Sequence, residues 1–195
     1  MLCLLLAAVL GGPSVCRAQA LLYDVYKGDD HIGQLHALRR QEGTQTHYLM
    51  SSAVKFRVLF EVRLDFRSES TFDGSYLRRS FTRNQLNDRE RDRSVVTRKG
   101  DGYEVARDDD DVVSLTHPGI EHNMSTIYYQ EPAGLSRIFS DKLGAFAVLT
   151  PVAPHEYEMV LPDGQVNYFR YDEQGRCVEV ECRHSLSTIY FRLRQ

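Results

Sequence analysis

The fold of this chain is indicated by residues 55–67, which read KFRVLFEVRLDFR. Apolar side chains alternate with charged ones along this stretch, and Leu59 breaks the pattern. Successive side chains of a β-strand point to opposite faces, so the stretch predicts one long strand with an apolar face and a charged face. The apolar face would consist of Phe56, Val58, Phe60, Val62, Leu64 and Phe66. At about 3.3 Å per residue the strand would run roughly 40 Å, a length typical of strands that coil around a curved sheet or a barrel.

Shorter strand patterns cover most of the remaining chain, and turn residues such as Asp73-Gly74 separate them. The expected strands are 21–27, 32–40, 46–55, 75–83, 94–99, 103–107, 157–161, 165–171, 176–183 and 188–193. Residues 87–93 have the composition of a charge-dense loop. Because hairpins between consecutive strands are the simplest connection, the sequence predicts an all-β fold, an antiparallel meander that forms a barrel or a strongly curved sheet.

One segment has helical spacing instead. Its apolar side chains recur at intervals of three and four residues, at Leu135, Ile138, Phe139 and Leu143, and Gly144 follows as a helix terminator. The pattern predicts one short helix near residues 135–143.

The first twenty residues have the pattern of a signal peptide. An apolar run at 2–10 precedes Ala18-Gln19-Ala20, the small-x-small sequence after which signal peptidase cleaves. The run is too short for a bilayer core, which needs roughly 20 residues. We therefore expect a periplasmic or secreted protein with one domain at 21–195 and no transmembrane segment. A lipid-attachment site at Cys16 is the weaker alternative, because the preceding residues match that motif poorly.

Composition and motifs argue against several functions. The chain has 24 Lys and Arg against 27 Asp and Glu, a formal net charge of -3, so we expect no nucleic-acid partner. The Gly-x-Ser-x-Gly, Gly-rich phosphate-loop and His-Glu-x-x-His motifs are absent from the sequence. Carboxylates that only folding brings together would leave no such motif, so a hydrolase remains a weaker alternative. We expect no cofactor and assign no catalytic residue.

The remaining candidates for special chemistry are cysteines, histidines and acids. Cys177 and Cys182 would lie roughly 16 Å apart on opposite faces of one strand, so we expect free thiols. His117 and His122 flank a turn and could bind a cation with a nearby Glu, but the spacing is typical of a surface loop. The four acids at 108–111 lack the spaced ligands and Gly of a calcium loop. We expect no metal site.

The apolar face at 56–66 has three interpretations. It could fill the core of a closed sheet, line a cavity for an apolar ligand, or face lipid in a transmembrane barrel. Charged pairs such as Arg78-Arg79 place charge on both faces of other strands, which argues against the third. The transmembrane barrel is therefore the weakest of the three interpretations, and all three stay open.

Several short motifs resemble an uncharacterised bacterial family of exported β-rich domains of unknown function. These are Tyr23-Asp24-Val25-Tyr26-Lys27-Gly28 with Ile32-Gly33, Ile127-Tyr128-Tyr129-Gln130-Glu131-Pro132 with Phe139-Ser140 and Gly144, and Pro162-Asp163-Gly164 with Asn167-Tyr168 and Tyr171. Such families are distantly similar to periplasmic lipoprotein carriers, which wrap a curved antiparallel sheet around a hydrophobic groove. The resemblance implies export and a β-fold, and it carries over no catalytic residue.

Glu131 follows two tyrosines at an expected strand end. It could form a polar gate to a cavity, or its hydrogen bonds could simply fix the turn into Pro132. We expect a non-enzymatic binding protein for an apolar or lipid-like molecule, held by the apolar face at 56–66 with Tyr128 and Glu131 near the cavity mouth. The alternative is a structural or interaction protein with a filled core, which would act through its charged face and the 87–93 loop.

Overall fold

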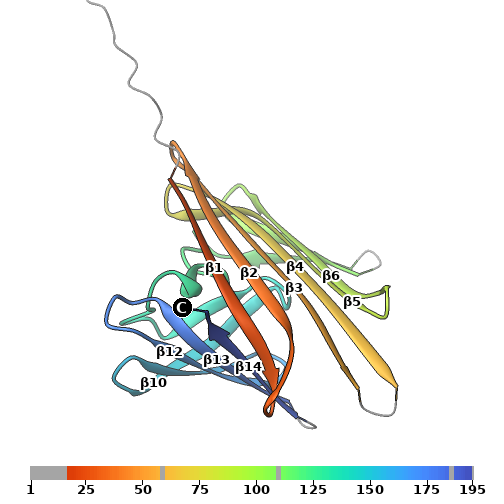
Figure 1. Ribbon diagram of the computed structural model, residues 1–195. Helices are drawn as coiled ribbons and strands as arrows, with labels where there is room; N and C mark the ends of the chain where they lie inside the picture. The colour runs from red at the N-terminus through yellow and green to blue at the C-terminus, as the bar shows by residue number, and fades with distance from the viewer. Residues whose placement is uncertain (1–16, 58–59, 109–110, 185–186, 195) are drawn as a thin grey trace, which may run out of the picture.

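The computed structural model describes residues 17–57, 60–108, 111–184 and 187–194, and these form one antiparallel sheet (Figure 1). The strands are β1 (Arg17–Lys27), β2 (Asp30–Glu42), β3 (Gln45–Arg57), β4 (Glu61–Asp73), β5 (Tyr76–Leu86), β6 (Arg89–Lys99), β7 (Gly102–Arg107), β8 (Asp111–Thr116), β9 (Arg137–Ser140), β10 (Ala145–Ala153), β11 (Glu156–Val160), β12 (Val166–Tyr171), β13 (Cys177–His184) and β14 (Ser187–Leu193). A 3-10 turn, η1 (Thr126–Tyr128), interrupts the connection from β8 to β9. The described residues include no helix that is long and apolar enough to cross a membrane.

The strand order shows a meander whose two ends meet in the middle of the sheet. The order is β8-β7-β6-β5-β4-β3-β2-β1-β14-β13-β12-β11-β10-β9, so the first and last strands pair with each other. The long strands β1–β6 form one side of the molecule, and the shorter strands β10–β14 curl beneath them (Figure 1). Since β8 and β9 end the order, the sheet is not closed. The all-β, antiparallel and strongly curved fold is thus confirmed.

Residues 55–67 are not one long strand, and this prediction was wrong. β3 ends at Arg57, β4 begins at Glu61, and Phe56 pairs directly with Val62. Even-numbered residues pair with even-numbered residues in this hairpin, so the apolar alternation continues through the turn without a change of phase. The turn also contains no Gly, Pro, Asn or Asp to mark it.

The short helix expected near residues 135–143 is also wrong, because the segment contains strand β9. Ile138 and Phe139 are both buried, and they pack into two different hydrophobic clusters on the two faces of this strand. A strand that is buried on both faces carries consecutive apolar residues, which removes the period of two. Gly144, at φ +62, ends the β9–β10 turn and donates its N–H to Ser140 O at 2.8 Å.

The expected loop at 87–93 is a tight hairpin. β5 ends at Leu86, β6 begins at Arg89, and the two turn residues Asn87 and Asp88 have φ of 50 and 63. Two successive positive φ angles are the geometry of a type I′ turn, in which Asn and Asp are favoured. The charged residues that follow belong to a strand, so this part of the chain offers no extended loop for a partner.

The interior of the curved sheet is largely filled by its own chain. The connection from β8 to β9 buries Ile120, Ile127 and Tyr128 against the strands. Ile120 is held in place by its backbone, which donates to the Tyr103 hydroxyl at 2.9 Å and accepts from the Leu77 N–H at 2.8 Å. A ligand could therefore bind only to those parts of the inner face of the sheet that the β8–β9 connection leaves uncovered.

Candidate functional site

A pocket of about 440 Å³ lies on the inner face of the sheet, where β1–β6 approach β13 and β14. Its apolar wall consists of Val25, Ile32, Val54, Phe56, Leu64, Phe66, Leu86, Cys182, Ile189 and Phe191. We call this space the inner pocket. It has the volume of a small-molecule site, which is about 300–1,000 Å³.

Strand register brings these side chains together. Val54 pairs with Leu64 and Leu64 with Leu86, so one apolar row crosses β3, β4 and β5. On the opposite side, the pairing of Val25 with Phe191 joins β1 to β14. Directly paired residues have their side chains on one face, about 5 Å apart, so each pairing extends the same wall. Two distant parts of the chain thus form one apolar surface.

Charged and polar side chains surround the apolar wall. Lys142 Nζ lies 3.5 Å from Asp92 Oδ2, and Asn84 donates from Nδ2 to the same carboxylate. Arg91 also lines the pocket, and the ammonium of Lys27 lies 4.5 Å from the centre of the Phe56 ring. An apolar wall with a polar rim suits a molecule that has an apolar body and a polar end.

Cys182 is part of this wall, and burial raises the pKa of its thiol to about 12. A neutral thiol is a poor nucleophile and a poor metal ligand. The second thiol, Cys177, is fully buried, and both cysteines are free on strand β13. Cys182 therefore contributes a neutral side chain to the wall of the inner pocket.

The structure assembles part of the apolar face expected at 56–66. Phe56, Leu64 and Phe66 line the inner pocket, and Val62 lies opposite Phe56 but outside the lining. Phe60 lies in the β3–β4 turn with 64% of its surface exposed, and it does not line the pocket. Val58 lies outside the described residues.

Tyr128 and Glu131 are not among the residues that line the inner pocket. The Tyr128 ring packs edge-on against Tyr23, at 5.4 Å between ring centres, in the main core. Glu131 accepts a hydrogen bond from the Tyr157 hydroxyl at 2.8 Å, and its other oxygen lies 2.8 Å from His155 Nδ1. Through these contacts Glu131 joins the segment before β9 to the β10–β11 hairpin.

Sequence reasoning missed the pocket residues that come from other strands: Val25, Ile32, Val54, Leu86, Ile189 and Phe191. Most of them lie in segments whose strand pattern was recognised, so each could have been assigned to an apolar face. The pairing of β1 with β14, which joins those faces, leaves no local sequence signal.

A buried polar cluster occupies the same inner face further along β4–β6. Ser68 pairs with Thr82 and Thr82 with Ser94, and their neighbours Ser70 and Ser80 pair as well. All five are buried. The hydroxyls of Ser70, Thr82 and Ser94 have no hydrogen-bond partner within the described chain.

Asp141, in the β9–β10 turn, is the one buried acid of the described residues. Its carboxylate accepts a hydrogen bond from Asn123 Nδ2 at 3.0 Å. Burial nevertheless raises the pKa of this carboxyl to about 6, because removal from water disfavours the charged form more than the hydrogen bonds favour it. The inner face thus changes from apolar to polar along its length.

His117 and the described acids of 108–111, considered above as cation ligands, contact other protein groups. No three His, Cys, Asp or Glu side chains converge within the described ranges. His117 accepts a backbone hydrogen bond from Gly119 at Nδ1, and its Nε2 lies 3.3 Å from Arg137 Nη2. Of the acids at 108–111, the structure describes Asp108 and Asp111, which contact Arg93 N and the Arg107 side chain.

Comparison with known proteins identifies a fold and a family. No curated protein matches the chain. The chain is similar to a solved structure described as a β-barrel-like protein of a domain of unknown function, DUF1849, from Brucella abortus. The TM-score is 0.57 at 10% identity, over 90% of this chain and 95% of that one, so the likeness shows the fold alone.

A family model described as a domain of unknown function, DUF6134, matches residues 23–194. The chain therefore belongs to the DUF6134 family of uncharacterised, β-rich domains.

Proposed function

We propose that the protein is an exported, non-enzymatic binding protein that holds an apolar or lipid-like small molecule in the inner pocket. The observation that carries this proposal is the row Val54–Leu64–Leu86 with Phe56, Phe66 and Phe191, an apolar wall that the chain covers only in part, since Leu64 is 39% exposed. The β8–β9 connection buries Ile127 and Tyr128 in the core cluster that also holds Val25 and Val54, but none of its residues lines the inner pocket. An uncovered apolar wall inside a curved sheet is a place where a ligand can replace water.

Ligand affinity would come from contact area. Each methylene that moves from water to the apolar wall contributes about 0.8 kcal/mol. The polar rim, with Asp92, Lys142 and Arg91, would orient the ligand so that its polar end stays near water. The neutral thiol of Cys182 supports binding without covalent attachment.

Export is the second element of the proposal, and it rests on the sequence of residues 1–20. Strand β1 begins at Arg17, and residues 17–20 pair with 38–41 of β2. Cleavage after Ala20 would leave 21–27 as a strand that still pairs with both β2 and β14. The intact mass of protein recovered from the periplasm of a bacterial host checks this, since the expected chain starts at Leu21.

The binding proposal is tested with a charge placed in the pocket wall. Leu64 is 39% exposed, so Leu64→Asp should fold and should weaken binding of the apolar fluorophore N-phenyl-1-naphthylamine by at least ~10-fold, because a ligand would bury the new carboxylate. Leu38, also 39% exposed but on β2 outside the inner pocket, provides the matched control Leu38→Asp. Binding should change less than about twofold in this control.

Mass spectrometry of an organic extract from the exported protein then identifies the ligand class. A stoichiometric amphiphile that is present in the wild type and Leu38→Asp, and absent from Leu64→Asp, is the expected result. Equal fluorophore binding by the two variants, with no extracted molecule, would instead support an interaction protein with a filled core.

A further inference from the structure

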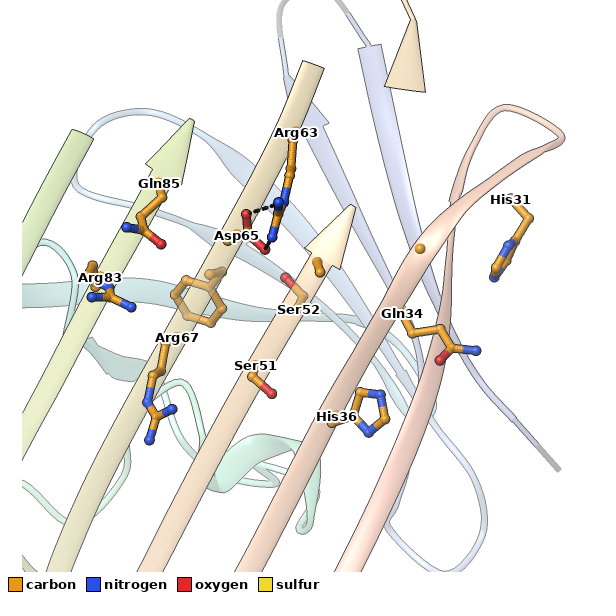
Figure 2. A pocket seen from close by; sticks show the side chains of 13 residues that line it. His31, Gln34, His36, Ser51, Ser52, Arg63, Asp65, Arg67, Arg83 and Gln85 are labelled. Carbon is orange, nitrogen blue, oxygen red and sulfur yellow. Dashed lines mark hydrogen bonds and ion pairs between the residues drawn. The ribbon is translucent and has the colours of Figure 1, made fainter. Parts of the chain in front are cut away.

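A second pocket, of about 550 Å³, lies on the opposite side of the same strands. Figure 2 shows its side chains, which come from β2–β5 and include Arg63, Arg67 and Arg83. We call this space the outer pocket. Of the residues that line it, three are Arg and one is an acid, Asp65, whereas the whole chain has a net charge of -3. Positive charge is therefore concentrated in this pocket.

Three arginines stand side by side across the sheet. Arg67 of β4 pairs with Arg83 of β5, and Arg83 pairs with Arg93 of β6. Like charges in directly opposed positions of an antiparallel pair repel each other and destabilise the sheet. Arg93 lies over the Phe81 ring of β5, 5.6 Å from its centre, and Gln85, the next outward-facing residue of β5, is uncharged.

The neighbouring acids neutralise only part of this charge. Arg63 Nε lies 2.8 Å from Asp65 Oδ2, and Arg67 Nε lies 2.6 Å from Glu69 Oε1. Arg83, in the middle of the row, has no acidic partner among the residues that the structure describes, although its side chain is half-buried. A half-buried guanidinium between two others is a strong site for a negative charge.

We propose that the outer pocket binds a phosphate-type oxyanion, with Arg83 and Arg67 as its main ligands. Guanidinium groups donate two parallel hydrogen bonds to a phosphate, and the bound charge would relieve the repulsion within the arginine row. Ser51, His36 and Gln34 line the same pocket and offer further hydrogen-bonding groups around it (Figure 2). This site is separate from the inner pocket and does not depend on what the inner pocket binds.

Calorimetric titration of the purified protein with inorganic phosphate, at low and constant ionic strength, tests the proposal. Arg83→Gln should weaken binding at least ~10-fold, because it removes charge-assisted hydrogen bonds. Arg79→Gln is the matched control: Arg79 lies on the same strand, pairs outside the arginine row and does not line the outer pocket. Arg79→Gln should weaken phosphate binding by less than about twofold, because the loss of one distant surface charge has only a small electrostatic effect.

A second arm distinguishes a free phosphate from a lipid headgroup. Flotation with phosphatidylcholine vesicles that contain phosphatidic acid is compared with phosphatidylcholine alone, for the same two variants. Phosphate binding that depends on Arg83 supports a soluble ligand, and Arg83-dependent flotation without phosphate binding supports a headgroup. If Arg83→Gln and Arg79→Gln behave alike in both assays, or the wild type binds neither probe, the site does not exist.

Discussion

The inner and outer pockets lie on opposite faces of strands β3–β5, and they have opposite chemistry. Ser52, Asp65, Phe66 and Gln85 line both of them, so only the backbone of the sheet separates the two spaces. On β4, Leu64 and Phe66 belong to the apolar wall, while Arg63 and Arg67 face the arginine-rich pocket. A period of two in sequence is therefore enough to place an apolar site and an anion site within one sheet thickness of each other.

The strongest effect we expect concerns the polar end of the inner face. Asp141 has its pKa raised to about 6 in the folded protein, so the folded state binds the proton more tightly than the unfolded state between about pH 4 and 6. Stability therefore falls as pH rises through this window, by up to about 3 kcal/mol, and Asp141→Asn should lack this slope. Urea unfolding of both proteins at pH 4.5 and 7.5 measures it. If the stability of the two proteins changes with pH in parallel, the carboxyl of Asp141 is in contact with water and the inner face has no buried charge at this end.

The next prediction compares the stability effects of substitutions at Phe66 and Arg67, which are adjacent in sequence but point to opposite faces of β4. Phe66→Ala removes a partly buried ring of the apolar wall and should lower the free energy of unfolding by roughly 2–3 kcal/mol, somewhat less than for a fully buried Phe. Arg67→Ala removes a half-exposed side chain on the other face and should cost less than about 1 kcal/mol. Urea midpoints at constant m-value check both. Equal losses would contradict the division of β4 into an apolar and a solvated face.

The alkylation rate of Cys182 reports whether ligand binding in one pocket affects the other. This thiol lines the inner pocket and Cys177 is fully buried, so slow alkylation by N-ethylmaleimide of the chain that starts at Leu21 should occur at Cys182 first. Saturating N-phenyl-1-naphthylamine should slow this reaction several-fold, and inorganic phosphate should leave its rate unchanged. Peptide mapping at timed intervals gives the rates. Protection by phosphate would show that the pockets are coupled through the sheet.

The smallest effect concerns the arginine row in the absence of an anion. Because Arg83 is flanked by two like charges, Arg83→Gln should raise the free energy of unfolding by about 0.5 kcal/mol in phosphate-free buffer. Added phosphate should stabilise the wild type and leave the variant unchanged, reversing their order. Thermal unfolding with and without phosphate shows this. A variant that is less stable in both buffers would indicate a structural role for Arg83.

Sequence pattern predicted most strands, but it missed β8, β9 and β10 and misread two turns. The β3–β4 turn was hidden because its pairing keeps even residues opposite even residues, and β9 resembled a helix because Ile138 and Phe139 are buried on opposite faces. The turn at Asn87-Asp88 was recognised only as a loop, although its residues favour a tight hairpin. For the β3–β4 turn and for β9, the missing information was which neighbours pair with or cover the strand, and alternation within that strand does not contain it.

Local pattern alone was sufficient for the all-β antiparallel fold and for the apolar character of Phe56, Leu64 and Phe66, because side-chain direction in a strand depends only on the parity of position. The pairing of β1 with β14, the filling of the interior by the β8–β9 connection, and the place of Tyr128 in the core were decided by tertiary structure. The same holds for the row Arg67, Arg83 and Arg93, whose members come from three strands. Contacts between residues that are distant in sequence depend on register and burial over the whole sheet, and no local stretch of the chain encodes them.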